Sequence, residues 1–129
     1  MIITPNFSLH EFKCHEGTPY PNKWVATRLR PLCELLEDIR DMFHDAPIKI
    51  VSGYRTPDYN KSIGGHENSQ HMFGKAADIS VKGVPSSKVR SEIKWHHTDG
   101  AFPMLHGLGR YDIFTHIDIR HVDDLHTWG

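Results

Sequence analysis

The segment SQHMFGKAAD, residues 69–78, places a histidine and an aspartate seven positions apart, with a glycine and two alanines between them. Residues 76–81 are small or β-branched on either side of the acid, a pattern that predicts a strand. His71 is then expected on the loop that enters this strand, and Gly74 allows the loop to turn back because glycine tolerates positive φ. Loop and strand together would bring the side chains of His71 and Asp78 to one point.

A second cluster lies near the C-terminus, in residues 113–119, which read IFTHIDI. Strand alternation puts His116 and Asp118 on the same face. Catalytic zinc usually takes three protein ligands from His, Asp or Glu and leaves the fourth position to water. His71, Asp78 and His116 therefore form a candidate set of zinc ligands.

The pattern Ser-x-His-x-x-Gly-x-Ala-x-Asp, followed by a distant histidine on a strand, resembles that of the zinc D-alanyl-D-alanine peptidases of bacterial cell-wall metabolism, which share the hedgehog/DD-peptidase fold. Residues 52–57 (SGYRTP) match the stretch that precedes the first ligand in that family. Residues 7–12 (FSLHEF) and 109–120 resemble the opening and the ending of its phage-encoded and cell-wall endopeptidase branch. The resemblance therefore covers most of the chain.

The resemblance implies a zinc metallopeptidase. One zinc ion held by His71, Asp78 and His116 would activate a water that hydrolyses a peptide bond of the peptidoglycan stem or cross-link. Arg55 is implied to lie beside the zinc as a catalytic and substrate-binding residue, because its planar fork binds carboxylates and oxyanions with two parallel hydrogen bonds. Two interpretations of Ser69 stay open: it binds substrate, as the matching serine of relatives does, or it only caps a turn.

The catalytic base is the point at which this sequence departs from the family pattern. Many relatives carry an acidic residue three positions before the last ligand and a histidine two positions before it, but here those positions hold Ile113 and Phe114. Asp118 shares the predicted face of His116, so we expect it to be the catalytic acid–base residue; it could instead only orient His116. Asp112 is the alternative, and it requires the chain to bend before His116.

The sequence does not select the bond that is cut. Relatives cleave a D-Ala-D-Ala terminus, a D-Ala cross-link or an L-Ala-D-Glu bond, as carboxypeptidases or endopeptidases. The loops that would decide, residues 13–23 and 96–107, carry no recognisable motif. His66 and His106 are expected in loops that border the cleft, whereas the other histidines outside the motifs are expected to be ordinary surface or core residues.

Two alternatives to a dedicated enzyme stay open. The same fold hosts non-catalytic proteins that keep the zinc cage as a structural or cell-wall-binding element, and the missing acid at Ile113 favours this alternative. The second is a phage structural or tail component that binds the cell wall and cuts it only locally.

The expected fold is α+β, with a small, largely antiparallel sheet packed on a long helix and the metal in an open cleft on the other face of the sheet. Apolar residues recur every three or four positions from Val25 to Phe43, which predicts the main helix over residues 29–44. Pro31 indicates that the regular helix begins near residue 29 or kinks there. Other elements are expected before and after this helix. A capping box of Ser8 and Glu11 begins a short helix, residues 48–51 form a strand, and a second short helix runs from Thr56 to Ile63. A further helix begins at 85–87 with Val89 and Ile93 buried, and residues 96–107 are irregular.

Length and composition are those of one ordinary globular domain, so residues 1–129 are expected to form a single zinc peptidase domain. The formal net charge is -1, without the basic surplus of a nucleic-acid-binding protein. Eleven histidines are compatible with metal binding but do not locate it. The two cysteines, Cys14 and Cys33, could form one bridge in principle, but we expect two partly buried free thiols.

The sequence allows only an indirect inference about localisation. No signal peptide is visible at the N-terminus, and no stretch approaches the ~20 apolar residues of a membrane helix. We therefore expect a monomer that does not insert into membranes and that reaches the cell wall by other means. A phage- or prophage-encoded lysin released by a pore-forming partner fits, as does a protein trimmed of its leader.

Overall fold

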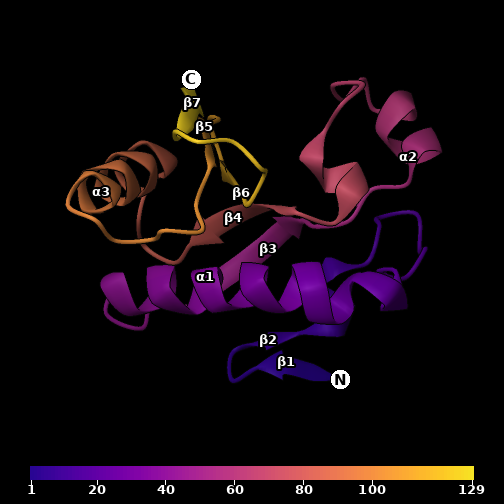
Figure 1. Ribbon diagram of the computed structural model, residues 1–129, viewed down its shortest axis with the longest axis horizontal. Helices are drawn as coiled ribbons and strands as arrows, with labels where there is room; N and C mark the ends of the chain where they lie inside the picture. The colour runs from indigo at the N-terminus through magenta and orange to yellow at the C-terminus, as the bar shows by residue number, and fades with distance from the viewer.

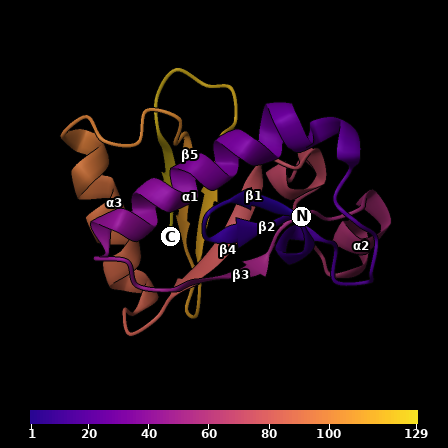
Figure 2. The same ribbon diagram turned by 90° about the horizontal axis from the view of Figure 1, so that it is seen from below.

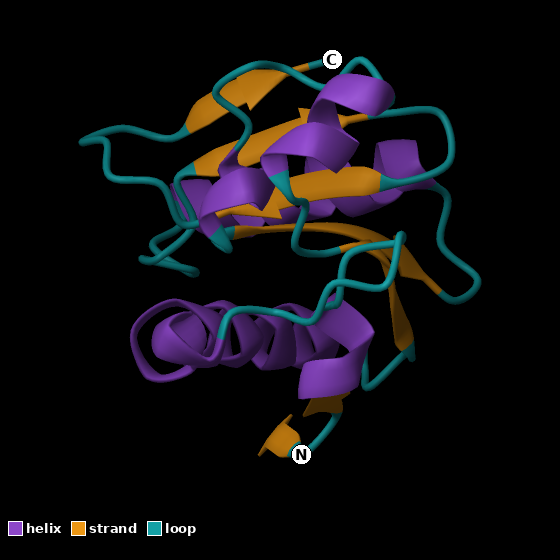
Figure 3. Ribbon diagram, turned by 90° about the vertical axis from the view of Figure 1, so that its right-hand side faces the viewer, coloured by secondary structure: helices purple, strands orange, loops and turns teal.

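The computed structural model describes residues 1–129, and its elements form layers on either side of one helix. A hairpin of β1 (Ile2–Thr4) and β2 (Phe7–Ser8) lies on one side of α1 (Arg30–Met42), and a five-stranded sheet lies on the other side (Figure 1, Figure 3). The sheet has the order β3-β4-β6-β5-β7, made of Ile48–Ser52, Ala76–Val81, Thr115–Asp118, Gly107–Arg110 and His126–Trp128. Neighbouring strands pair antiparallel except β5 and β7, which are parallel. The predicted α+β class is confirmed.

Helix α1 forms because its apolar residues fall on one face. Leu32, Leu36 and Ile39 are fully buried in the main core. Before α1 the chain passes through a short 3-10 turn η2 (Asn22–Trp24) and a π-helical turn η3 (Val25–Leu29). Pro31 occupies the first turn of α1, where its missing N–H costs nothing. The prediction that the regular helix begins near residue 29 is confirmed.

The two faces of the sheet have opposite characters. Ile79 of β4 and Ile117 of β6 are buried in the same core as the leucines of α1, which crosses the sheet (Figure 2). Because side chains alternate along a strand, Asp78 and His116 point to the opposite face. The strand sequence thus places the candidate metal ligands away from α1.

Three further helical elements begin where the sequence predicts. The N–H of Ser8 donates to the Glu11 carboxylate at 2.8 Å, at the start of η1 (Leu9–Phe12). The Thr56 hydroxyl accepts from the Tyr59 N–H at 3.1 Å and begins α2 (Pro57–Ser62). Helix α3 (Ser86–Thr98) buries its apolar pair Val89 and Ile93, as the sequence predicts.

Two predictions need correction. Residues 96–107 are not all irregular, because α3 continues to Thr98 and β5 begins at Gly107. Nothing in the last turn of α3 breaks the helix before Gly100, which adopts a φ of 96°. The free thiols of Cys14 and Cys33 are fully rather than partly buried.

None of the helices is long and apolar enough to span a membrane.

Candidate metal centre

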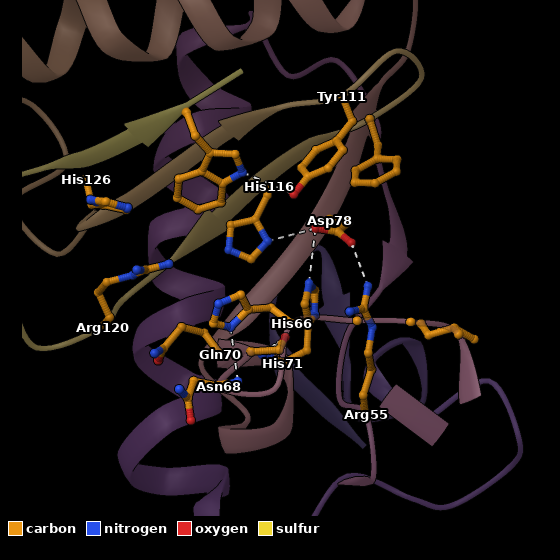
Figure 4. A pocket seen from close by; sticks show the side chains of 16 residues that line it. Arg55, His66, Asn68, Gln70, His71, Asp78, Tyr111, His116, Arg120 and His126 are labelled. Carbon is orange, nitrogen blue, oxygen red and sulfur yellow. Dashed lines mark hydrogen bonds and ion pairs between the residues drawn. The ribbon is translucent and has the colours of Figure 1, made fainter. Parts of the chain in front are cut away.

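Three side chains that could ligate a metal meet on the face of the sheet that points away from α1. Asp78 on β4 lies directly opposite His116 on β6 in the antiparallel register. His71 reaches them from the 3-10 turn η4 (Gln70–Phe73). One ligand-type atom from each of the three residues lies within 4.8 Å of the other two (Figure 4).

The turn that carries His71 is defined by the residues at its two ends. At its start the Ser69 hydroxyl accepts the N–H of His71 at 3.2 Å. At its end Gly74 has a φ of 67°, and its carbonyl accepts the Tyr20 phenol at 2.7 Å. An added Cβ at Gly74 would lie 2.6 Å from the Tyr20 oxygen, so position 74 requires glycine for both backbone angle and space.

In each histidine, the outer ring nitrogen, which points away from Asp78, already makes a hydrogen bond. His71 Nδ1 lies 2.7 Å from the Gly53 carbonyl, which can only accept, so Nδ1 carries the proton and Nε2 faces Asp78 Oδ1 at 3.1 Å. His116 Nε2 donates to Asp118 Oδ2 at 2.8 Å, and its Nδ1 faces the same Asp78 oxygen at 3.0 Å. Such outer partners select the tautomer and ring orientation of metal-ligating histidines.

The charges at this point call for a cation. Burial alone would raise the pKa of Asp78, but its contacts with His116 and His71 outweigh burial and hold that pKa well below its ordinary value. Burial lowers the pKa of His71. Burial would also lower the pKa of His116, but its hydrogen bonds to Asp118 and Asp78 outweigh burial and raise it. Of the three residues, only His116 has its pKa raised above the ordinary value.

The donor set fits one zinc ion. Two imidazole nitrogens and one carboxylate oxygen are typical ligands of catalytic zinc, and the open cleft leaves room for a fourth position. Asp78 Oδ1 faces both imidazoles, whereas Arg55 contacts only Oδ2, and a divalent cation would supply the partner of Oδ1. His71, Asp78 and His116 would be its ligands.

Arg55 lies beside this group, as the sequence predicts. Its Nη2 donates to Asp78 Oδ2 at 3.2 Å, and its Nη1 and Nε donate to Asn60 and Ser52, each at 3.3 Å. The guanidinium therefore orients the Asp78 carboxylate, and its remaining N–H groups are available to a ligand in the cleft.

Asp118 lies behind His116 rather than in the cleft. Its side chain has no exposed surface and accepts from His116 and, twice, from the Arg120 guanidinium, at 2.8 and 2.6 Å. Burial would raise its pKa, but the hydrogen bonds from Arg120 and His116 hold that pKa well below its ordinary value. Of the two roles left open by the sequence, this geometry favours orientation of His116. Asp112 is exposed and does not line the cleft.

The cleft has a volume of about 700 Å³ and opens above the three ligands. Its lining residues are Arg55, Ile63, Gly64, Gly65, His66, Asn68, Ser69, Gln70, His71, Asp78, Tyr111, Phe114, His116, Arg120, His126 and Trp128. His66 and Ser69 border the cleft as expected, but His106 does not. Four further cleft residues were not predicted from the sequence: Tyr111, Arg120, His126 and Trp128. Strand-like alternation of His126 and Trp128 is the only signal that could have found the last two.

A His-Asp-His group with pre-oriented imidazoles at the base of an open cleft is typical of enzymes that bind one catalytic zinc ion. The model of one family, peptidase M15, matches residues 5–118, and the chain belongs to that family. It is 41% identical over 46 residues to the zinc D-Ala-D-Ala carboxypeptidase of Streptomyces albus G, covering 36% of this chain and 18% of that protein. It is 40% identical over 52 residues to the probable peptidoglycan L,D-endopeptidase MepK of Haemophilus influenzae, covering 36% of this chain and 28% of that protein. The chain thus matches only a minor part of the length of both relatives.

Proposed function

We propose that residues 1–129 form one zinc peptidase domain of the hedgehog/DD-peptidase type that hydrolyses a peptide bond in the peptidoglycan stem or cross-link. The observation that carries this proposal is the pair of histidines whose inner nitrogens face the ionised Asp78 carboxylate while their outer nitrogens are committed. Membership of the peptidase M15 family and the names of both relatives support a peptidoglycan substrate.

Each site residue has a distinct part in this proposal. His71, Asp78 and His116 would hold the zinc, which when bound supplies Lewis acidity and a water nucleophile at neutral pH. Arg55 holds the Asp78 carboxylate and presents its free N–H groups to a carboxylate or oxyanion of the peptide. Ser69 caps the turn of His71 and also lines the cleft, so it is placed for either role predicted from the sequence.

Asp118 acts through His116 in this proposal. Its carboxylate keeps the proton on His116 Nε2 and thereby leaves Nδ1 as the nitrogen that faces the metal position. Direct proton transfer by Asp118, as predicted from the sequence, would require the buried carboxylate to leave Arg120. Exchange of Asp118 for asparagine separates the two roles.

The cleft suits an anionic peptide. Two arginines, Arg55 and Arg120, line it; each is paired with a carboxylate, of Asp78 and of Asp118, and the remaining N–H groups of Arg55 are available to a ligand. Peptidoglycan stems carry free carboxylates, which suit these N–H groups. We further propose that the domain acts on the cell wall as a monomer and that it is of phage or prophage origin.

Hydrolysis of purified peptidoglycan tests the proposal. Zinc-loaded protein should release new amino groups from peptidoglycan, chelator-treated protein should not, and zinc should restore the reaction. Mass spectrometry of products from defined muropeptides would identify the bond. A protein that holds one zinc and sediments with peptidoglycan but releases no product would instead be the non-catalytic cell-wall-binding protein considered above.

A further inference from the structure

Tyr111 is held in place at the cleft although 42% of the residue is exposed. Its ring stacks on Phe114 with centroids 4.6 Å apart and planes at 16°. Its backbone N–H donates to the Phe114 carbonyl at 3.0 Å, and its own carbonyl accepts the Ser86 hydroxyl at 2.6 Å. The two hydrogen bonds thus fix the backbone of Tyr111 and the stack on Phe114 fixes its ring at the cleft.

Trp128 adds a further constraint from the C-terminal strand. Its indole Nε1–H donates to the Tyr111 phenol oxygen at 3.1 Å. The indole can lie across β5 because Gly109 pairs with it there, and a side chain at Gly109 would collide with the indole. Gly109 also pairs with His116 on its other side, and the rings of Trp128 and His116 are 5.1 Å apart. The register of three strands thus aligns Tyr111, through Trp128, with the metal centre.

The indole hydrogen bond determines where the phenol proton can point. Indole Nε1–H is a donor only, so the Tyr111 oxygen accepts from it and its own O–H remains free to donate elsewhere. Figure 4 shows the Tyr111 hydroxyl directed into the cleft, on the side where His116 and Asp78 lie and away from Arg55.

The two arginines of the cleft are more strongly committed. Arg55 is bonded to Asp78, and Arg120 is bonded twice to Asp118. His66 Nδ1 accepts the N–H of Asn68 at 3.1 Å, which directs that ring toward its own loop. Tyr111 is therefore a neutral donor of the cleft whose proton has no partner within the chain and whose ring is held in place by Phe114 and Trp128.

We propose that Tyr111 is a catalytic residue that donates a hydrogen bond to the carbonyl oxygen of the scissile peptide bond, and that Trp128 is its positioning residue. This inference rests on the proposed peptidase function. Negative charge develops on that oxygen in the transition state, where a pre-oriented donor contributes more than it does toward the unreacted carbonyl. The phenol keeps its proton throughout, so no covalent step involves Tyr111.

The first test is Tyr111→Phe, which keeps the ring stack and removes only the hydroxyl. The turnover number on a defined muropeptide should fall about 100-fold, as for loss of one oxyanion donor, with an unchanged KM. Zinc content and melting temperature should stay at wild-type values. A phosphinate analogue of the peptide, whose tetrahedral oxygens imitate the transition state, should bind more weakly by calorimetry. Tyr54→Phe is the matched control, because Tyr54 packs against Tyr20 and Trp24 outside the cleft, and it should behave as wild type.

The second test uses Trp128→Phe, which keeps an aromatic ring but removes the indole donor. Turnover should fall less than in Tyr111→Phe, and the loss should vanish when Tyr111 is already phenylalanine, since coupled residues are not additive. Additive losses, wild-type turnover of Tyr111→Phe, or a rise in KM alone would each overturn the inference. Failure of the proposed function is distinguishable, because then wild-type protein itself releases no product from any muropeptide.

Discussion

The two halves of the cleft are built in different ways. The ligand half, residues 52–78, supplies His71, Asp78 and Arg55 from a short stretch of chain in which caps, a tight turn and glycines determine the geometry. The wall half, residues 107–128, supplies its residues through pairing of β5, β6 and β7, including one parallel pair. The family match ends at residue 118, within the wall half. The difference shows that local sequence can place two of the three candidate metal ligands, whereas His116 and the surface that faces the substrate depend on strand register.

Removal of a ligand should have the largest effect. His71→Ala leaves two protein ligands, so the protein should lose its zinc and its peptidase activity, a greater loss than the ~10- to 100-fold typical of outer partners. Helix content should stay nearly unchanged because His71 lies on a short turn. Elemental analysis and circular dichroism measure these two outcomes. The exposed His121→Ala is the control, and full zinc content in His71→Ala would contradict the assignment.

Asp118→Asn tests how the wall half supports the ligand half. The neutral amide holds Arg120 and the His116 Nε2 proton less well, so zinc affinity should fall by ~10- to 100-fold while turnover at saturating zinc is largely kept. Metal titration with a competing chelator and kinetics at high zinc measure this. Intact zinc affinity with a ~100-fold loss of turnover would instead show the acid–base role predicted from the sequence. Asp112→Asn should match wild type in both measurements.

Arg55→Lys tests the ligand half alone. Lysine keeps the charge but cannot contact Asp78, Asn60 and Ser52 together. Hydrogen bonds to charged groups contribute about 1.5–3 kcal/mol, so kcat/KM should fall roughly 10- to 100-fold with zinc still bound. Steady-state kinetics with metal analysis measures the change. Arg40→Lys, which removes an arginine paired with Asp45 away from the cleft, is the control. Wild-type kinetics in Arg55→Lys would make Arg55 an ordinary loop residue.

Zinc uptake should depend on pH through His116. Its pKa is raised above 6.5, so in the zinc-free protein a proton on His116 competes with the metal. Zinc affinity should therefore rise with pH, by up to about tenfold per unit for one displaced proton, and level off above the raised pKa. The stability that protonated His116 gives the zinc-free fold should show the opposite trend and be lost as pH rises through that pKa. Calorimetry in buffers of different ionisation enthalpy counts the proton, and a pH-independent affinity would contradict the assignment.

The smallest effects should come from substitution of the two glycines of β5. These variants test whether Asp118 and Trp128 have separate roles. A side chain at Gly109 meets Trp128, whereas one at Gly107 meets the Asp118 carboxylate. Each alanine variant should lose about 1–3 kcal/mol of unfolding free energy through overpacking. Only Gly107→Ala should also weaken zinc binding. Urea denaturation and metal titration measure these outcomes, and equal zinc affinities in the two variants would contradict the separate roles of Asp118 and Trp128.

The ligand half could be predicted from sequence because its determinants are close together. The spacing from His71 to Asp78, the glycine turn between them and the small residues of β4 all act within ten residues. The helix stripe of α1 and the Thr56 cap were predictable for the same reason, since periodicity and capping are local.

The wall half could not be predicted because its contacts join residues far apart in the chain. Trp128 reaches the cleft only because β7 pairs parallel with β5 and because a glycine lies opposite it. The alternation of β6 correctly put Asp118 beside His116, but only the structure shows that Arg120 and the lack of exposure keep its carboxylate out of the cleft. Likewise, His126 rather than His106 lines the cleft, because β7 carries the former alongside Trp128.

The position of Trp128 also gives the protein a built-in optical reporter. The chain has three tryptophans: Trp24 packs against Tyr20 and Tyr54, Trp95 is exposed on α3, and Trp128 alone lies against a metal-ligand ring. Cobalt(II) takes the same ligands as zinc and quenches nearby indole emission. It should therefore lower the fluorescence of Trp128 more than that of the other two tryptophans. Titration of the fluorescence would then follow occupancy of the metal site and docking of the C-terminal strand in one signal, without any substrate.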